Sequence, residues 1–362
     1  MIPILRPLLP SAEKLAPYLR AVDQSRVYSN FGPHACALEG RLASHYGLED
    51  ETITTVANAT LGLALALVAQ DVPAGSLCVM PAWTFTASMN AAILAGMVPF
   101  FADVDAATWA LDPHAIEKEI AQAPGKVGGV MVVAPFGRPI DYQAWDGFKR
   151  RSGLPVVIDA AAAFDSLQVG ETPAVVSLHA TKVIGIGEGG FVACRDASIV
   201  RSVRQRSNFG FLGARTAALP GMNAKLSEYH AAVGLAALEA WPQTRAAWMA
   251  VASAYRQELG RSNRISLQPG FGETWVSSTC IVTVDEEVSA RIQERLAAAG
   301  IETRLWWGRG AHEQPAAADF PRARVPVTER LARATFGIPF YRDIEPDKIK
   351  HVTDSLIAAA ST

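Results

Sequence analysis

The pattern of hydrophobic and polar positions divides the chain into two parts. From about residue 50 to 195, short β-branched runs alternate with longer segments of helical periodicity, which is typical of βαβ units around a mainly parallel sheet. The predicted strands span residues 52–56, 76–80, 98–104, 129–134, 154–159, 175–178 and 190–194. The predicted helices between them span residues 61–69, 87–95, 113–121 and 142–152.

After Gly210 the pattern changes. An alanine-rich run over residues 231–241 and a long helix after it are predicted to lead into a second domain. That domain would hold a strand over 278–284, helices over 289–300 and 346–360, and a proline-rich loop over 314–327. We therefore expect an α/β protein with an N-terminal arm and large domain over residues 1–240 and a small C-terminal α/β domain over residues 241–362.

Composition narrows the classes of ligand. Lys and Arg number 33 against 35 Asp and Glu, so the net charge of -2 gives no general attraction to nucleic acid or to an anionic membrane. No run approaches the roughly 20 apolar residues of a spanning helix. Prolines and an arginine interrupt the apolar residues of the first ten positions, so we expect no secretory signal and a cytoplasmic location.

Metal chemistry has no support in the sequence. There is no H-E-x-x-H motif, no C-x-x-C pair and no cluster of His and carboxylate residues, so no metal is expected. The four cysteines are far apart, and three of them lie in apolar runs. We expect reduced, buried thiols.

Asp159 and Lys182 form the most informative pair. Asp159 closes the apolar run 154–158, so we expect it at the carboxyl end of a buried strand, where open α/β sheets bind ligands. Lys182 follows 23 residues later, between small and apolar neighbours that would desolvate its amine and lower its pKa. A Schiff-base lysine and a carboxylate that keeps a ring nitrogen protonated suit pyridoxal phosphate. The alternatives are a surface lysine and a turn aspartate, the commoner fates of these residue types.

A phosphate site is predicted at the helix start after Val56. The segment 56–65 has the pattern strand, polar turn and apolar helix, so its first free amides would point at an anion. Ser177 could add a hydroxyl. The plain alternative is an ordinary helix start capped by Asn58.

Three further segments allow competing interpretations. The glycine run 185–190 matches G-x-G-x-x-G but leads into a strand, so we expect close backbone approach to a ligand rather than a dinucleotide site. The basic stretch 201–206 is expected to be a solvated helix face rather than a diphosphate contact. Trp306 and Trp307 either pack in the protein or wall a sugar or base.

Taken in order, the motifs resemble the DegT/StrS-type family of pyridoxal phosphate (PLP)-dependent nucleotide-sugar aminotransferases over nearly the whole chain. The matching segments are residues 29–33, 38–39, 58–60, 81–85, 103–105, 159–161, 177–190, 221–223, 227–228, 300–304 and 337–340. The resemblance implies the type I PLP-dependent transferase fold and a homodimer with shared active sites.

The resemblance also implies a role for each matching residue. Lys182 would form the aldimine with the cofactor and move the proton, and Asp159 would pair with the pyridine nitrogen. The other implied contacts are Phe85 on the ring; the amides of Ala59 and Thr60 and the hydroxyls of Thr60 and Ser177 on the phosphate; Asn223 on that phosphate across the dimer; and Asn30, Gly32 and His179 near the sugar. Ala162 stands where the family usually has a glutamine near the ring hydroxyl, so a neighbour or water would substitute there.

The implied reaction moves an amino group from an amino acid, for which we expect glutamate, to a nucleotide-linked keto-deoxy sugar, for which we expect a dTDP sugar. It would run through the Lys182 aldimine and pyridoxamine phosphate. One rival is the sugar dehydratase branch of the family, which has histidine at the lysine position. Another is a catalytically silent PLP-binding sensory protein on the same scaffold. The sugar carbon that receives the amine is left open.

Overall fold

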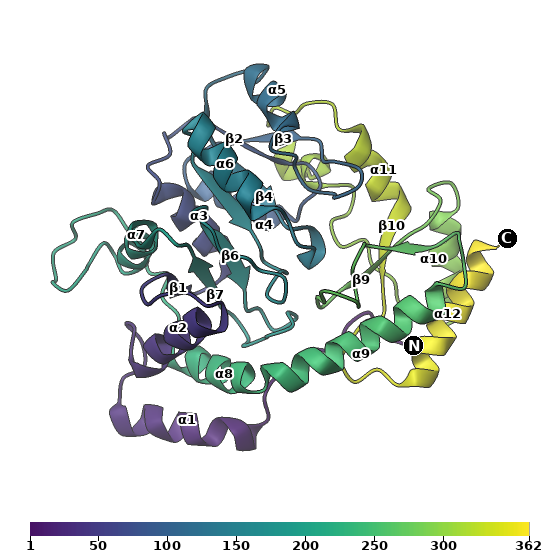
Figure 1. The fold of residues 1–362 in the computed structure, drawn as a ribbon, viewed down its shortest axis with the longest axis horizontal. Coiled ribbons are helices and arrows are strands. Elements are labelled where there is room, and N and C mark those ends of the chain that lie inside the picture. The colour runs from purple at the N-terminus through teal and green to yellow at the C-terminus, as the bar shows by residue number, and fades with distance from the viewer. Residues whose placement is uncertain (362) are drawn as a thin grey trace.

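The larger of two sheets organises the computed structural model, which describes residues 1–361 (Figure 1). Its seven strands have the order β1-β7-β6-β5-β4-β2-β3. They are β1 (Ile53–Val56), β2 (Leu77–Pro81), β3 (Val98–Ala102), β4 (Val127–Val133), β5 (Val156–Asp159), β6 (Ala174–Ser177) and β7 (Gly190–Ala193). Strands β2 to β6 pair in parallel, whereas β7 is antiparallel to β1 and β6. The predicted mainly parallel, mixed sheet is confirmed.

Helices cover both faces of this sheet, which explains why its strands are almost continuous apolar runs. Successive side chains of a strand point to opposite faces. In β4, Val130 and Val132 join the core that contains Trp145 and Phe148, whereas Met131 joins the core that contains Leu63. Two separate cores therefore fix the sheet between two helical layers.

The helices follow the local start and stop signals of the sequence. They are α1 (Ala12–Ser25), α2 (Pro33–His45), α3 (Ala59–Val68), α4 (Thr86–Leu94), α5 (Ala115–Ala121), α6 (Tyr142–Ser152), α7 (Ala197–Ser207), α8 (Glu228–Glu239), α9 (Trp241–Leu259), α10 (Ser289–Ala298), α11 (Pro326–Ala334) and α12 (Pro346–Ala360), with short 3-10 turns η1 (Pro135–Gly137), η2 (Ala311–Glu313) and η3 (Pro315–Ala317). In α6, the Asp141 carboxylate accepts a hydrogen bond from the amide of Ala144, and Gly153 ends the helix with a φ of 66°.

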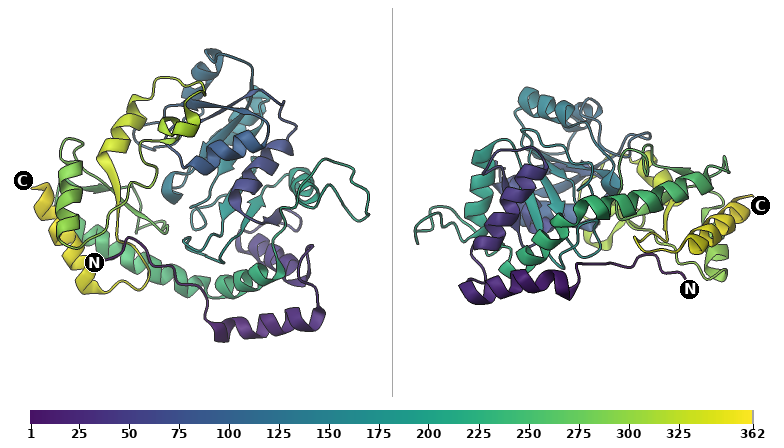
Figure 2. Two further views of the ribbon diagram at one scale, coloured as in Figure 1. Left: turned by 180° about the vertical axis from the view of Figure 1, so that it is seen from behind. Right: turned by 60° about the horizontal axis from the view of Figure 1, so that its bottom comes forward.

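The smaller sheet lies beyond α9, the long helix that runs from the large sheet toward α10 and α12 (Figures 1 and 2). It consists of β8 (Ser266–Leu267), β9 (Cys280–Thr283) and β10 (Thr335–Ile338), all antiparallel. The proposed domain boundary at residue 240 falls between α8 and α9. The first residues of the chain lie against this smaller lobe, because Ile2 bridges Ile301 and the Ile4 carbonyl accepts from Phe340.

Among residues 1–361, no helix combines the length and the apolar character needed to cross a bilayer.

Candidate active site

A cavity of about 440 Å³ opens at the carboxyl edge of the large sheet. Asp159 and Ser177 end β5 and β6, and Asn58 follows β1, so three strands deliver polar residues to one place. The site residues expected from the sequence that line this cavity are Ala59, Thr60, Phe85, Asp159, Ser177, His179, Lys182 and Trp306. Residues that are spread over almost 250 positions of the chain therefore line the same cavity.

Asp159 lies at the end of a chain of hydrogen bonds that runs from Thr84 through Ser88. Its side chain is buried at 6% exposure. One carboxylate oxygen accepts from the Ser88 hydroxyl at 2.6 Å, and the other accepts from the Ala161 amide at 3.1 Å. Burial raises the pKa of Asp159, while these hydrogen bonds and the charge of Lys182 oppose the rise. A cation in the cavity would therefore stabilise the ionised carboxylate.

Lys182 lies in the turn between β6 and β7. Its backbone amide donates to the carbonyl of His179 at 2.9 Å, which fixes the turn that carries the amine. Burial lowers the pKa of Lys182, and the charge of Asp159 works against that shift. Within residues 1–361 Lys182 and Asp159 interact through their charges without forming a direct ion pair, and both line the cavity. Lys182 and Asp159 thus face the same cavity. The lowered pKa of Lys182 favours the neutral, nucleophilic form of its amine.

The start of α3 forms the other end of the cavity. Asn58 accepts from the Leu61 amide at 3.0 Å, so the ordinary helix cap that we considered is present. This cap leaves the amides of Ala59 and Thr60 at the free positive end of the helix. Gly190 starts β7 beside them, and a Cβ there would lie 3.0 Å from the Ala59 nitrogen. An anion can therefore approach the backbone closely at this point.

Aromatic and polar side chains complete the wall. Phe85 is 55% exposed although it is a large apolar residue, because it lines the cavity instead of the core. His179 contacts the Thr181 hydroxyl at 2.9 Å and lies 3.7 Å from Glu188. Trp307 stacks on Phe136 with centroids 3.9 Å apart, so one tryptophan of the pair packs between the lobes. Trp306 lines the cavity beside it.

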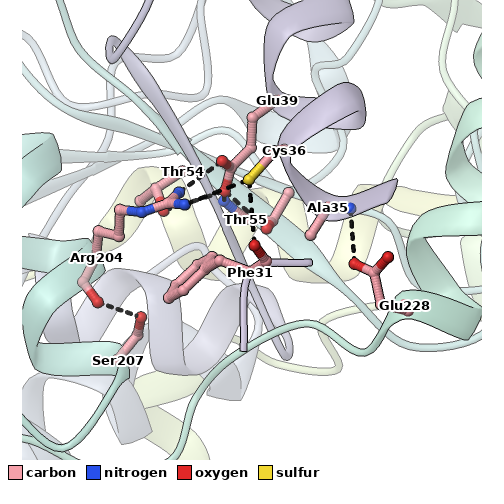
Figure 3. A network of polar contacts seen from close by, with 9 residues as sticks. All are labelled: Phe31, Ala35, Cys36, Glu39, Thr54, Thr55, Arg204, Ser207 and Glu228. Carbon is pink, nitrogen blue, oxygen red and sulfur yellow. Dashed lines mark hydrogen bonds and ion pairs between the residues drawn. The ribbon is translucent and has the colours of Figure 1, made fainter. Parts of the chain in front are cut away.

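Three residues expected near ligands do not line this cavity within the chain. Asn30 and Asn223 are exposed, whereas Gly32 is buried against Glu228. Glu228 accepts a hydrogen bond from the amide of Ala35 at 2.9 Å (Figure 3) and another from the amide of His34 at 2.7 Å. This buried carboxylate fixes the start of α2 and the loop before it. The roles of Asn30, Gly32 and Asn223 stay predictions.

The basic stretch of α7 is solvated only in part: Arg201 is exposed as expected, whereas Arg204 and Arg206 are not. Arg204 donates to Glu39 at 2.6 Å and lies over the ring of Phe31 at 3.8 Å (Figure 3). Arg206 is 8% exposed and donates to the Pro220 carbonyl. These partners are remote in sequence, so the local pattern could not reveal them. Cys36, which contacts Phe31 in this network, is exposed, unlike the other three cysteines.

Several residues in or directly behind the cavity wall were missed by sequence reasoning. Ser88 and Thr84, whose hydroxyls lie 2.7 Å apart, are spaced i, i+4 at the start of α4, and that spacing was an available signal. Glu188 and Ser278 also line the cavity, as does Arg304, to which we had assigned no role. In the described part of the chain, no group of three or more His, Cys, Asp or Glu residues could hold a metal.

Comparison with known proteins identifies the family. The model of the DegT/DnrJ/EryC1/StrS aminotransferase family matches residues 11–357. A dTDP-4-amino-4,6-dideoxy-D-glucose transaminase from Shigella dysenteriae is 32% identical over 271 residues, which cover 73% of this chain and 72% of that protein. The resemblance drawn from the motifs is thereby confirmed.

Solved structures agree on the fold. DesI, crystallised in the presence of its TDP-sugar product, superposes with a TM-score of 0.87 at 30% identity over 98% of this chain and 92% of its own. NtdA from Bacillus subtilis with bound cofactor PMP has the same fold, with a TM-score of 0.86 at 21% identity over 97% of this chain and 82% of its own. The chain belongs to the DegT/DnrJ/EryC1/StrS aminotransferase family.

Proposed function

We propose that this enzyme transfers an amino group from glutamate to a nucleotide-linked keto-deoxy sugar, with pyridoxal phosphate as its cofactor. The observation that carries the proposal is that Lys182 and Asp159 line one cavity whose far end is the free N-terminus of α3. The donor would leave as a 2-oxo acid, and the sugar would gain the amine in place of its keto oxygen.

The residues present fit this cofactor. Its phosphate matches the amides of Ala59 and Thr60 and the hydroxyl of Ser177, at the positive end of a helix. Its cationic ring nitrogen matches the buried carboxylate of Asp159, and the flat ring matches the exposed face of Phe85. When bound, pyridoxal phosphate supplies an aldehyde that condenses with amines and a ring that accepts the electron pair released at the donor carbon.

The protein's own groups would divide the work. Lys182 Nζ would hold the cofactor at its aldehyde, and its amine, once free, would take up and return the proton of the donor. Asp159, held by Ser88 and Ala161, would pair with the ring nitrogen, whose positive charge would favour the ionised carboxylate. Ala162 lines the cavity without a polar side chain, and Ser278 is a nearby hydroxyl that could take the part of the missing glutamine.

The substrate class follows from the relatives. The Shigella protein is a transaminase of a dTDP-linked deoxysugar, and DesI binds a TDP-sugar product. For this chain we extend that preference to a dTDP-linked keto-deoxy sugar. A dehydratase of the same family is disfavoured because its position 182 would be histidine. A silent PLP-binding protein is disfavoured because both Lys182 and Asp159 reach the cavity.

The test is a two-stage assay on the purified holoenzyme. Glutamate alone should shift the cofactor absorbance to the amine form and release 2-oxoglutarate in stoichiometric amount. A dTDP-4-keto-6-deoxy sugar should then restore the original spectrum and yield an amino sugar detectable by mass spectrometry. A shift with glutamate but no amino sugar from any keto-sugar nucleotide would reject the substrate class, and deoxygenated product would favour the dehydratase.

We also propose a homodimer in which Asn223 of one subunit completes the phosphate site of the other. Asn223 is exposed and lies outside the cavity of its own chain, where its amide oxygen accepts from Lys225 at 2.8 Å. Exposed aromatic residues occur on nearby segments, including Phe209 and the stacked pair Tyr28 and Tyr229. Such residues suit a surface that a second copy covers.

Subunit mixing tests this shared site. N223D should repel the phosphate and K182A should lack the amine, so each variant alone should be nearly inactive. After the two are unfolded and refolded together, about a quarter of wild-type activity should return, because half of the random dimers are hybrids with one intact site. If Asn223 acts within its own chain, or not on the phosphate, mixing will restore nothing beyond the sum of the two variants.

A further inference from the structure

Arg304 is the cationic side chain of the cavity for which the proposed chemistry has no role. Among the described residues that line this cavity, only Lys182 and Arg304 carry a lysine or arginine charge. In the proposed function, Lys182 binds the aldehyde of the cofactor. The start of α3 also lines the cavity and is the proposed site of the phosphate. The guanidinium is therefore left for another anion.

The surrounding residues hold the guanidinium in place but leave part of it free. The Arg304 backbone is tied to Gly337 of β10 by hydrogen bonds in both directions, at 3.1 and 2.8 Å. Nη2 donates to Glu302 at 2.8 Å, and the other oxygen of Glu302 accepts from the Ile4 amide at 2.9 Å. The guanidinium carbon lies 5.0 Å from the Trp306 ring. Within residues 1–361, Nη1 and Nε have no hydrogen-bond acceptor, and the side chain is 44% exposed.

The negative charges that line the cavity make a cation necessary if a further carboxylate is to bind there. Asp159 and Glu188 already place two carboxylates there. An amino acid that enters brings a further carboxylate, which must leave water beside these groups. A carboxylate placed there without a paired cation would be strongly unfavourable. A planar guanidinium with two free donors is the group that binds a carboxylate best.

We infer that Arg304 binds a carboxylate of the amino donor and so selects amino acids as donors, an inference that rests on the proposed transamination. Glu302 is then a positioning residue that links Arg304 to the N-terminal arm. The keto-sugar nucleotide has no carboxylate in the proposed substrate class, and its diphosphate is the competing anion that the sugar half-reaction tests.

The two half-reactions separate these roles. In R304M holoenzyme, the glutamate concentration that gives half-maximal conversion should rise about 10- to 100-fold, as expected for a lost charged hydrogen bond. The reaction of the amine form of the cofactor with the keto-sugar nucleotide should keep its wild-type constants. R309M removes an exposed arginine outside the cavity and should behave as wild type. If R304M does not fold, R304K should show a smaller change in the same direction.

Two donor analogues identify which carboxylate is bound. Alanine lacks the side-chain carboxylate of glutamate, and 4-aminobutyrate lacks the α-carboxylate. One analogue should be a poorer donor than glutamate for the wild-type enzyme but equal to glutamate for R304M. The carboxylate that this analogue lacks is the one that Arg304 binds. Equal loss in both half-reactions, loss in the sugar half-reaction only, or no change would overturn the inference. If wild type itself converts no donor, the proposed function fails instead, and that outcome is visible before any variant is made.

Discussion

K182A should lose essentially all turnover, by at least about a thousandfold, while it keeps the fold. In the proposed mechanism Lys182 supplies both the nucleophile and the proton carrier, and general acid-base catalysis alone contributes about 100- to 10,000-fold. Its side chain makes no ion pair with Asp159 among the described residues, and burial lowers its pKa. Removing it therefore costs little stability. Steady-state amino-sugar formation and the cofactor absorbance spectrum measure the loss.

K182R is the matched control for charge. Arginine keeps the positive charge near Asp159, but its pKa above about 12 prevents it from acting as a neutral amine. We expect K182R to be as inactive as K182A. Multiple turnovers by either variant would contradict the role given to Lys182.

D159N should lower kcat by about 10- to 1,000-fold, the second largest effect. A carboxylate close to a pyridinium raises the pKa of that ring by about 1 to 3 units, and each unit is worth a factor of about 10. Asparagine has the same shape, and its amide can still accept from Ala161 and contact Ser88. The fold should survive, while the ring loses its anionic partner. Single-turnover rates with saturating glutamate measure this effect without the influence of sugar binding.

S88A is the control for Asp159. It removes one hydrogen bond to the carboxylate and leaves the charge in place. Because the carboxylate keeps its charge and its hydrogen bond from Ala161, S88A should reduce the rate less than D159N does. An S88A effect equal to or larger than that of D159N would mean that the relay through Thr84 and Ser88, not the charge, is what matters.

The elements around the site could be predicted because they depend on local pattern. The strand before Asp159 is a run of apolar residues buried on both faces, and α6 between Asp141 and Gly153 has both of its caps in the sequence. The helix start after Asn58 was visible for the same reason. These three segments deliver Asp159 and the phosphate site to one edge of the sheet.

The remainder depends on contacts between distant residues. The amphipathic helices α1 and α2 were not predicted. Both pack against α8, which is distant in the sequence, so the local pattern did not reveal this contact. Arg204 was read as solvated because its partner Glu39 lies 165 residues away. Arg304 stood only in the matching segment 300–304 without a role, and the tertiary structure brings it to the cavity. Local sequence gave no sign of these pairings.

Borohydride reduction of the holoenzyme followed by peptide mass spectrometry tests the central claim most directly. The reduction makes the bond between the cofactor and its lysine permanent, so the modified residue can be read from the fragment masses. The account predicts one modified lysine, Lys182, and no modification once glutamate has converted the cofactor. Attachment to any other lysine, or a firmly bound cofactor that leaves Lys182 unmodified, would contradict it.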